Sequence, residues 1–177
     1  MMTTRRRLLQ GITATGIGLG AARSAAAQAR MPGELRFLNL HTGERLQVSY
    51  ADDVGYLDDG LAEINRLLRD HRTGDVHPID PGVLDILNAA RLALAPGGTF
   101  EIISGYRSPK TNAMLAAAGR AVAKRSLHMQ GRAIDIRLTG MPTRLLRDCC
   151  VAMKRGGVGY YAKSNFVHVD TGRVRRW

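Results

Sequence analysis

Apolar residues recur along the middle of the chain at the spacing of α-helices. One series, with steps of four, three and four residues, predicts a helix that ends near 71–74 and comprises Leu57, Leu61, Ile64 and Leu68. Asp80 as N-cap and Pro81 in the first turn predict a second helix, which the segment 96–98 ends. Segments 111–123 and 143–154 are also predicted to be helical, the latter with one face formed by Leu146, Cys149 and Met153.

Other segments alternate between apolar and polar residues, as strands do. Residues 34–50 alternate in two halves about 41–43, which predicts a β-hairpin. Two later strands carry polar side chains on one face only: Asp135 lies opposite the apolar residues of its strand, and His168 shares a face with Asp170. The predicted strands after the hairpin are 99–104, 133–138, 158–161 and 166–170.

Helices that pack on a small, mostly antiparallel sheet make an α+β domain. We expect residues 34–177 to form one such domain after a short tether at 28–33, since this length supports a single hydrophobic core. The two cysteines, Cys149 and Cys150, are adjacent, so a disulfide between them would be strained. They are expected to be small, buried or half-buried apolar side chains.

The first 27 residues have the features of a bacterial twin-arginine (Tat) export signal. Consecutive arginines at 5–7 precede an apolar run at 11–22 and the small residues at 24–27. The apolar run has twelve residues, too few to span a bilayer, which takes about 20. We therefore expect a periplasmic protein, cleaved after Ala27 or Ala29, with no stable membrane anchor.

The chain is strongly basic, with 26 lysines and arginines against 15 acidic residues and a formal net charge of +11. Four of these arginines belong to the predicted signal, and the rest of the chain remains basic. An exported basic protein has an acidic partner in the polyanionic cell wall. Nucleic acid is the alternative partner, but export and an aromatic content of 5% argue against it. We expect a monomer.

Three side chains in the second half of the chain have the types and spacing of a metal site. His128 precedes Gly131, so a turn can bring it back beside Asp135, and His168 lies on the polar face of a later strand. A carboxylate inside a strand needs a partner, because an unpaired buried charge is costly. Each residue alone would be an ordinary polar side chain. Together, two imidazoles and a carboxylate with a fourth position open to water are the ligands of a catalytic zinc site.

The same residues belong to longer motifs. Ser126-x-His128-x-x-Gly131-x-Ala133-x-Asp135 followed by a late His168 resembles the zinc peptidases of bacterial cell walls, which include D-Ala-D-Ala carboxypeptidases and dipeptidases and the lysostaphin and hedgehog relatives. One branch, the exported murein endopeptidases of the K type, is similar over 38–44, 68–74, 104–109, 156–161 and 166–177. The resemblance implies an α+β zinc peptidase domain, with His128, Asp135 and His168 as ligands of Zn²⁺.

The resemblance also implies a catalytic role for Arg107. The arginine of this motif lies beside the metal, where its permanent charge either stabilises the charge that develops on the attacked carbonyl or holds a substrate carboxylate. Three tyrosines in or near the motifs are expected either to line the site or simply to pack: Tyr106, Tyr160 and Tyr161.

The general base is not defined by the resemblance. Relatives place a glutamate or a histidine where this chain has Asn165 and Phe166, and neither of these accepts a proton from water. Asp170 is the best local candidate, because it shares the strand face of His168. It is expected either to be the base or to orient His168 as a hydrogen-bond acceptor.

Three functional hypotheses follow. The leading one is a zinc-dependent endopeptidase that cuts peptide cross-links of peptidoglycan at an amide involving meso-diaminopimelate, by analogy with the branch that it resembles. The choice between 3-3 and 4-3 cross-links stays open. A D,D- or L,D-carboxypeptidase acting on wall peptides would use the same chemistry. A zinc-containing wall-binding module without catalysis is the third, because the usual base is absent.

Overall fold

The computed structural model describes residues 32–120 and 122–177. The predicted export signal at 1–27 and most of the tether at 28–33 therefore lie outside the described residues. The elements follow in the order β1 (Gly33–Asn39), β2 (Arg45–Ala51), α1 (Asp58–Leu67), α2 (Pro81–Leu94), β3 (Phe100–Ser104), α3 (Pro109–Ala117), the 3₁₀ helix η1 (Leu127–Gln130), β4 (Ala133–Leu138), α4 (Thr143–Met153), β5 (Gly157–Tyr161), β6 (Phe166–Asp170) and β7 (Arg175–Arg176).

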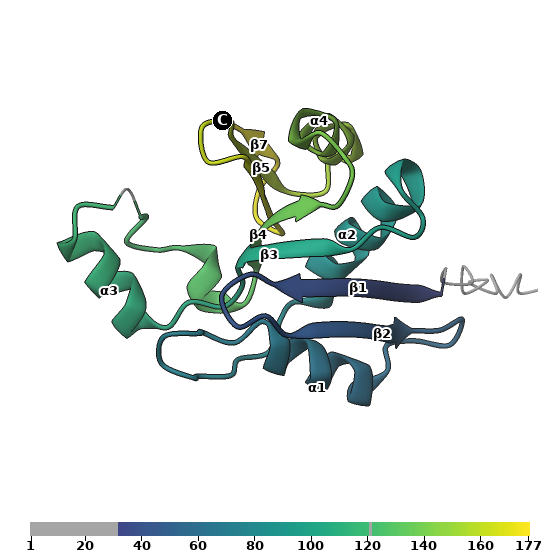
Figure 1. Cartoon of the computed structure of the whole chain (residues 1–177), viewed down its shortest axis with the longest axis horizontal. Helices are drawn as coiled ribbons and strands as arrows, with labels where there is room; N and C mark the ends of the chain where they lie inside the picture. The colour runs from purple at the N-terminus through teal and green to yellow at the C-terminus, as the bar shows by residue number, and fades with distance from the viewer. Residues whose placement is uncertain (1–31, 121) are drawn as a thin grey trace, which may run out of the picture.

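Within the described residues, seven strands form one sheet in the order β2-β1-β3-β4-β6-β5-β7 (Figure 1). The predicted hairpin is present as β1 and β2, which pair antiparallel. Most neighbouring strands are antiparallel, whereas β1 with β3 and β5 with β7 are parallel. The expected α+β class with a mostly antiparallel sheet is thus confirmed.

The two faces of the sheet differ in the side chains they carry and in the helices that cover them. Helices α2 and α4 pack against each other and against one face, while α1 lies along β2 (Figure 1). The apolar sides of the central strands are buried in this core, as their alternation predicts: Ile134, Ile136, Leu138, Val167 and Val169. The opposite face of β4 and β6 carries the polar side chains Asp135, His168 and Asp170. Among the described residues, no helix is both long and apolar enough to cross a membrane.

Helix α2 begins as predicted, whereas the bounds predicted for the next helix are wrong at both ends. Asp80 Oδ1 accepts a hydrogen bond from the Gly82 N–H at 2.9 Å, the N-cap arrangement. Helix α3 begins at Pro109, because the hydroxyl of Ser108 caps it by accepting from the Thr111 N–H at 3.2 Å. It ends at Ala117, shortly before Gly119, whose φ of 71° is left-handed.

The cysteines of α4 are free thiols, as expected. Cys150 is buried beside Leu146, and burial raises the pKa of the Cys150 thiol to about 12. Cys149 and Met153 are only half-buried, so the innermost stripe of the helix runs through Cys150 rather than Cys149. The thiol of Cys150 therefore acts as a small apolar core group.

Candidate metal centre

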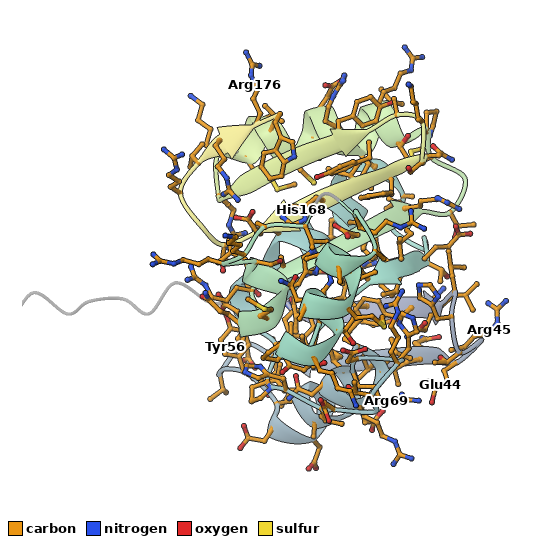
Figure 2. All side chains as sticks on the ribbon, turned by 90° about the vertical axis from the view of Figure 1, so that its left-hand side faces the viewer. Glu44, Arg45, Tyr56, Arg69, His168 and Arg176 are labelled. Atoms are coloured by element: carbon orange, nitrogen blue, oxygen red, sulfur yellow. The ribbon has the colours of Figure 1, made fainter. Side chains whose placement is uncertain are left out.

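Neighbouring strands place two of the predicted ligands side by side. In the antiparallel register of β4 and β6, Asp135 is the cross-strand partner of His168. His168 Nδ1 lies 2.8 Å from Asp135 Oδ1. Figure 2 shows His168 near the middle of the side of the molecule on which α3 projects in Figure 1. The alternation of each strand thus puts both side chains on the face away from α2 and α4.

A tight turn adds the third predicted ligand. His128 lies in η1, which is followed by Gly131 with φ of 65°, a conformation that favours glycine. A Cβ atom at this position would also overlap the carbonyl oxygen of Pro78. The turn brings His128 Nε2 to 3.2 Å from His168 Nδ1 and 3.4 Å from Asp135 Oδ1.

The three side chains form a group whose ligand atoms all lie within 4.8 Å of one another. The outer nitrogen of each imidazole faces an acceptor: His128 Nδ1 lies 2.8 Å from the Gly105 carbonyl oxygen, and His168 Nε2 lies 3.0 Å from Asp170 Oδ2. Because these nitrogens donate, the inner nitrogen of each ring carries a lone pair when the ring is neutral. Two lone pairs and a carboxylate then converge, so the donor set fits a cation of the zinc type.

Asp170 lies behind His168, on the side of the ring away from the other two ligand side chains. It is 0% exposed, and Arg175 donates to both of its oxygens, at 3.0 and 2.7 Å. Gly157 N–H and Gly172 N–H donate to Oδ1 as well. Burial opposes ionisation of Asp170, but the hydrogen bonds from His168 and Arg175 outweigh it and hold the pKa of this carboxyl below its ordinary value.

Arg107 reaches the same site from the loop after β3. Its backbone N–H donates to the His128 carbonyl at 3.2 Å, and its Nη2 donates to Ser104 Oγ at 3.3 Å. Burial lowers the pKa of the Arg107 guanidinium, while the nearby carboxylate of Asp135 acts in the opposite direction. A positive charge thus lies close to the three candidate ligands.

A buried carboxylate that the sequence interpretation did not single out holds the Arg107 loop. Asp70 is 1% exposed and accepts from the backbone N–H groups of Ser108 at 2.8 Å and Arg72 at 2.9 Å. Burial opposes its ionisation, yet its hydrogen bonds lower the pKa of Asp70 to about 2. The sequence pointed to Asp70 only through its position in the segment 68–74, one of those that resemble the murein endopeptidases. The turn after α1 therefore anchors the loop that carries Arg107.

Asn165, at one of the positions where relatives carry a base, faces another part of the fold. Its Oδ1 accepts from Thr143 Oγ1, at the start of α4, at 2.8 Å. Phe166 stacks on Tyr161 with ring centroids 4.5 Å apart.

Sequence reasoning assigned no role to Trp177, whose ring centroid lies 5.3 Å from that of His168.

An α+β sheet that carries a His–Asp–His group opposite its helices is the arrangement of an M15 metallopeptidase, a metal-dependent class. The family model described as peptidoglycan L,D-endopeptidase MepK matches residues 24–177. This chain belongs to that family.

Curated relatives extend the similarity over nearly the whole chain. Peptidoglycan L,D-endopeptidase MepK of Escherichia coli strain K12 is 40% identical over 178 aligned residues, which cover 98% of this chain and 96% of the relative. The Shigella flexneri protein of the same name has the same identity and coverage. The probable peptidoglycan L,D-endopeptidase MepK of Haemophilus influenzae is 42% identical over 147 residues, 82% of this chain and 79% of the relative.

Proposed function

We propose that this protein is a zinc-dependent peptidoglycan L,D-endopeptidase of the periplasm. The convergence of His128 Nε2, Asp135 Oδ1 and His168 Nδ1 is the observation that carries the proposal. The names of the relatives support the substrate and the bond class. The twin-arginine segment at 5–7 supports export across the inner membrane.

The zinc ion, when bound, would lower the pKa of a water molecule and polarise the carbonyl of the amide. The protein's own groups prepare this chemistry. The Gly105 carbonyl fixes the tautomer and direction of His128, and Asp170 does the same for His168. Arg107 places a permanent positive charge where the carbonyl oxygen gains negative charge.

We assign Asp170 the orientation of His168 rather than proton transfer from water. Both of its oxygens accept hydrogen bonds from Arg175, and the side chain is completely buried. The imidazole of His168 also separates it from the inner ligand atoms. A proton acceptor has to reach the water that it activates, either directly or through one further water.

The bond class in the names of the relatives favours one cross-link. An L,D-endopeptidase cuts an amide between an L-centre and a D-centre, and a 3-3 cross-link between two diaminopimelate residues contains such a bond. A 4-3 cross-link joins two D-centres instead. A carboxypeptidase would use the same ligands and the same Arg107, but would release a terminal residue instead of separating two linked peptides.

The test is a digestion of purified sacculi by the zinc-loaded mature protein, with separation of the released muropeptides. Loss of 3-3 linked dimers with matching gain of monomers is expected. Release of single terminal residues would indicate a carboxypeptidase, and unchanged muropeptides would indicate a binding module.

The zinc content of the purified protein should be about one ion per chain, and the double variant His128→Ala with His168→Ala should lose this zinc. Stoichiometric zinc in that double variant would contradict the ligand assignment.

A further inference from the structure

Strand β5 continues the face of the sheet that carries the metal ligands. Because side chains alternate along a strand, every second residue of β5 faces the same side as His168. The antiparallel register pairs these residues with the site face of β6: Gly157 with Asp170, Gly159 with His168, and Tyr161 with Phe166. Tyr161 therefore stands on the site face, whereas Tyr160 belongs to the core face.

The two glycines of β5 leave room for side chains from β7 and the residue that follows it. A Cβ atom at Gly159 would come within 2.6 Å of the indole ring of Trp177. The backbone of Trp177 is fixed alongside β5, since its N–H donates to the Val158 carbonyl at 3.2 Å and its carbonyl accepts from the Tyr160 N–H at 2.9 Å. The indole thus lies over Gly159 and beside His168.

One hydrogen bond then defines the direction of the Tyr161 hydroxyl. Trp177 Nε1 lies 3.1 Å from the Tyr161 hydroxyl oxygen, and an indole N–H can only donate. The hydroxyl is the acceptor of this bond, so its own hydrogen points elsewhere, and accepting one hydrogen bond strengthens its donation to another group.

The Tyr161 side chain is held in place but stays accessible from solvent. Its ring is held by the stack on Phe166, yet the residue is 40% exposed. The Tyr161 hydroxyl thus lies beside the indole that neighbours His168, on the face of the sheet that carries the candidate ligands.

We infer that Tyr161 is a second donor, with Arg107, to the carbonyl oxygen of the cleaved amide, and that Trp177 positions the Tyr161 hydroxyl. This inference rests on the proposed endopeptidase function. Such a donor acts most strongly when the oxygen gains charge, so its loss lowers kcat and leaves KM near its original value.

The test compares three single variants on a soluble cross-linked wall peptide, each loaded with zinc. Tyr161→Phe removes only the hydroxyl and should lower kcat by about 10²-fold, the usual effect of one such donor, with zinc content unchanged. Trp177→Phe keeps an aromatic ring but removes the indole N–H, and should lower kcat by a smaller factor. Tyr160→Phe is the matched control, because Tyr160 faces the core, under the Arg147 guanidinium at 4.6 Å, and should leave kcat unchanged.

A double variant separates positioning from independent effects. If Trp177 acts through the Tyr161 hydroxyl, Trp177→Phe added to Tyr161→Phe should cause no further loss of kcat. Multiplying losses would overturn the role of Trp177, and a normal kcat or a change in KM alone for Tyr161→Phe would overturn the role of Tyr161. In both cases the active wild type would keep the endopeptidase proposal intact. A wild type that leaves the cross-link uncut would overturn both proposals.

Discussion

At the scale of single residues, the site depends on side chains whose outer atoms are already bound. His128 and His168 each direct one ring nitrogen to an acceptor, which leaves the other nitrogen facing the candidate metal site. Asp170 is itself held by Arg175 and two backbone amides. His128, His168 and Asp170 are therefore held in defined orientations, and single substitutions should separate the roles of the groups around the site.

Arg107→Ala should keep zinc and the fold but lower turnover by about 10²-fold or more, because the charge on the carbonyl oxygen then lacks its partner. The measurement is kcat on a cross-linked wall peptide, together with zinc content. Arg147→Ala is a control, since that guanidinium pairs with Asp148 on α4, across the sheet from the candidate ligands. Normal turnover of Arg107→Ala would show that the guanidinium has no part in the reaction.

Asp170→Asn should weaken zinc binding by about 10- to 100-fold and lower activity with it, because the amide no longer fixes His168 by a charged hydrogen bond. Competition with a zinc chelator measures the affinity. Restoring turnover with saturating zinc would agree with an orienting role. Normal zinc affinity with a severe loss of turnover would instead assign proton transfer to Asp170.

At the scale of elements, alternation along strands made the shared face of Asp135 and His168 predictable. Asp135 interrupts the apolar residues of β4, and His168 does the same in β6, so both strands and both polar faces follow from the sequence. The place of Trp177 could not be predicted in this way. It depends on the pairing of the two-residue strand β7 with β5, which has no periodicity of its own.

The Arg107 loop has an electrostatic anchor in Asp70, whose pKa of about 2 lies below the unfolded value of about 4. A carboxyl with a lowered folded pKa stabilises the fold above the unfolded value, and this stabilisation is lost as pH falls toward 2. Asp70→Asn should therefore lower the free energy of unfolding by about 2 kcal/mol near neutral pH.

The difference between wild type and Asp70→Asn should shrink below pH of about 4, as measured by urea unfolding across a pH series. Asp75→Asn, in the same turn but exposed, is the control and should change little at any pH. A difference from wild type that stays constant down to pH of about 2 would contradict the electrostatic role of Asp70.

At the scale of the whole molecule, one face of the sheet builds the core and the other carries the candidate site. The face toward α2 and α4 supplies the apolar core, and the other face brings together the candidate ligands from η1, β4 and β6, with Arg107 from the loop after β3. The basic character of the chain suits a polyanionic wall, provided that the protein reaches it.

Export should depend on the consecutive arginines. Arg5→Lys combined with Arg6→Lys should leave precursor in the cytoplasm, because the Tat pathway requires the arginine pair. Fractionation of cells followed by immunodetection measures the distribution, and Arg23→Lys, beyond the apolar run, is the control. Undiminished periplasmic protein from the double variant would mean that another route carries this chain.

The indole of Trp177, beside His168, gives the protein an intrinsic fluorescent probe of the site. Trp177 is the only tryptophan of the chain, so the intrinsic emission excited at the red edge of protein absorption comes from one side chain in contact with the site. Loading the site with a paramagnetic divalent ion should quench that emission, and a diamagnetic ion should shift it without quenching. Occupancy of the centre could then be followed in real time, with no label and without any turnover.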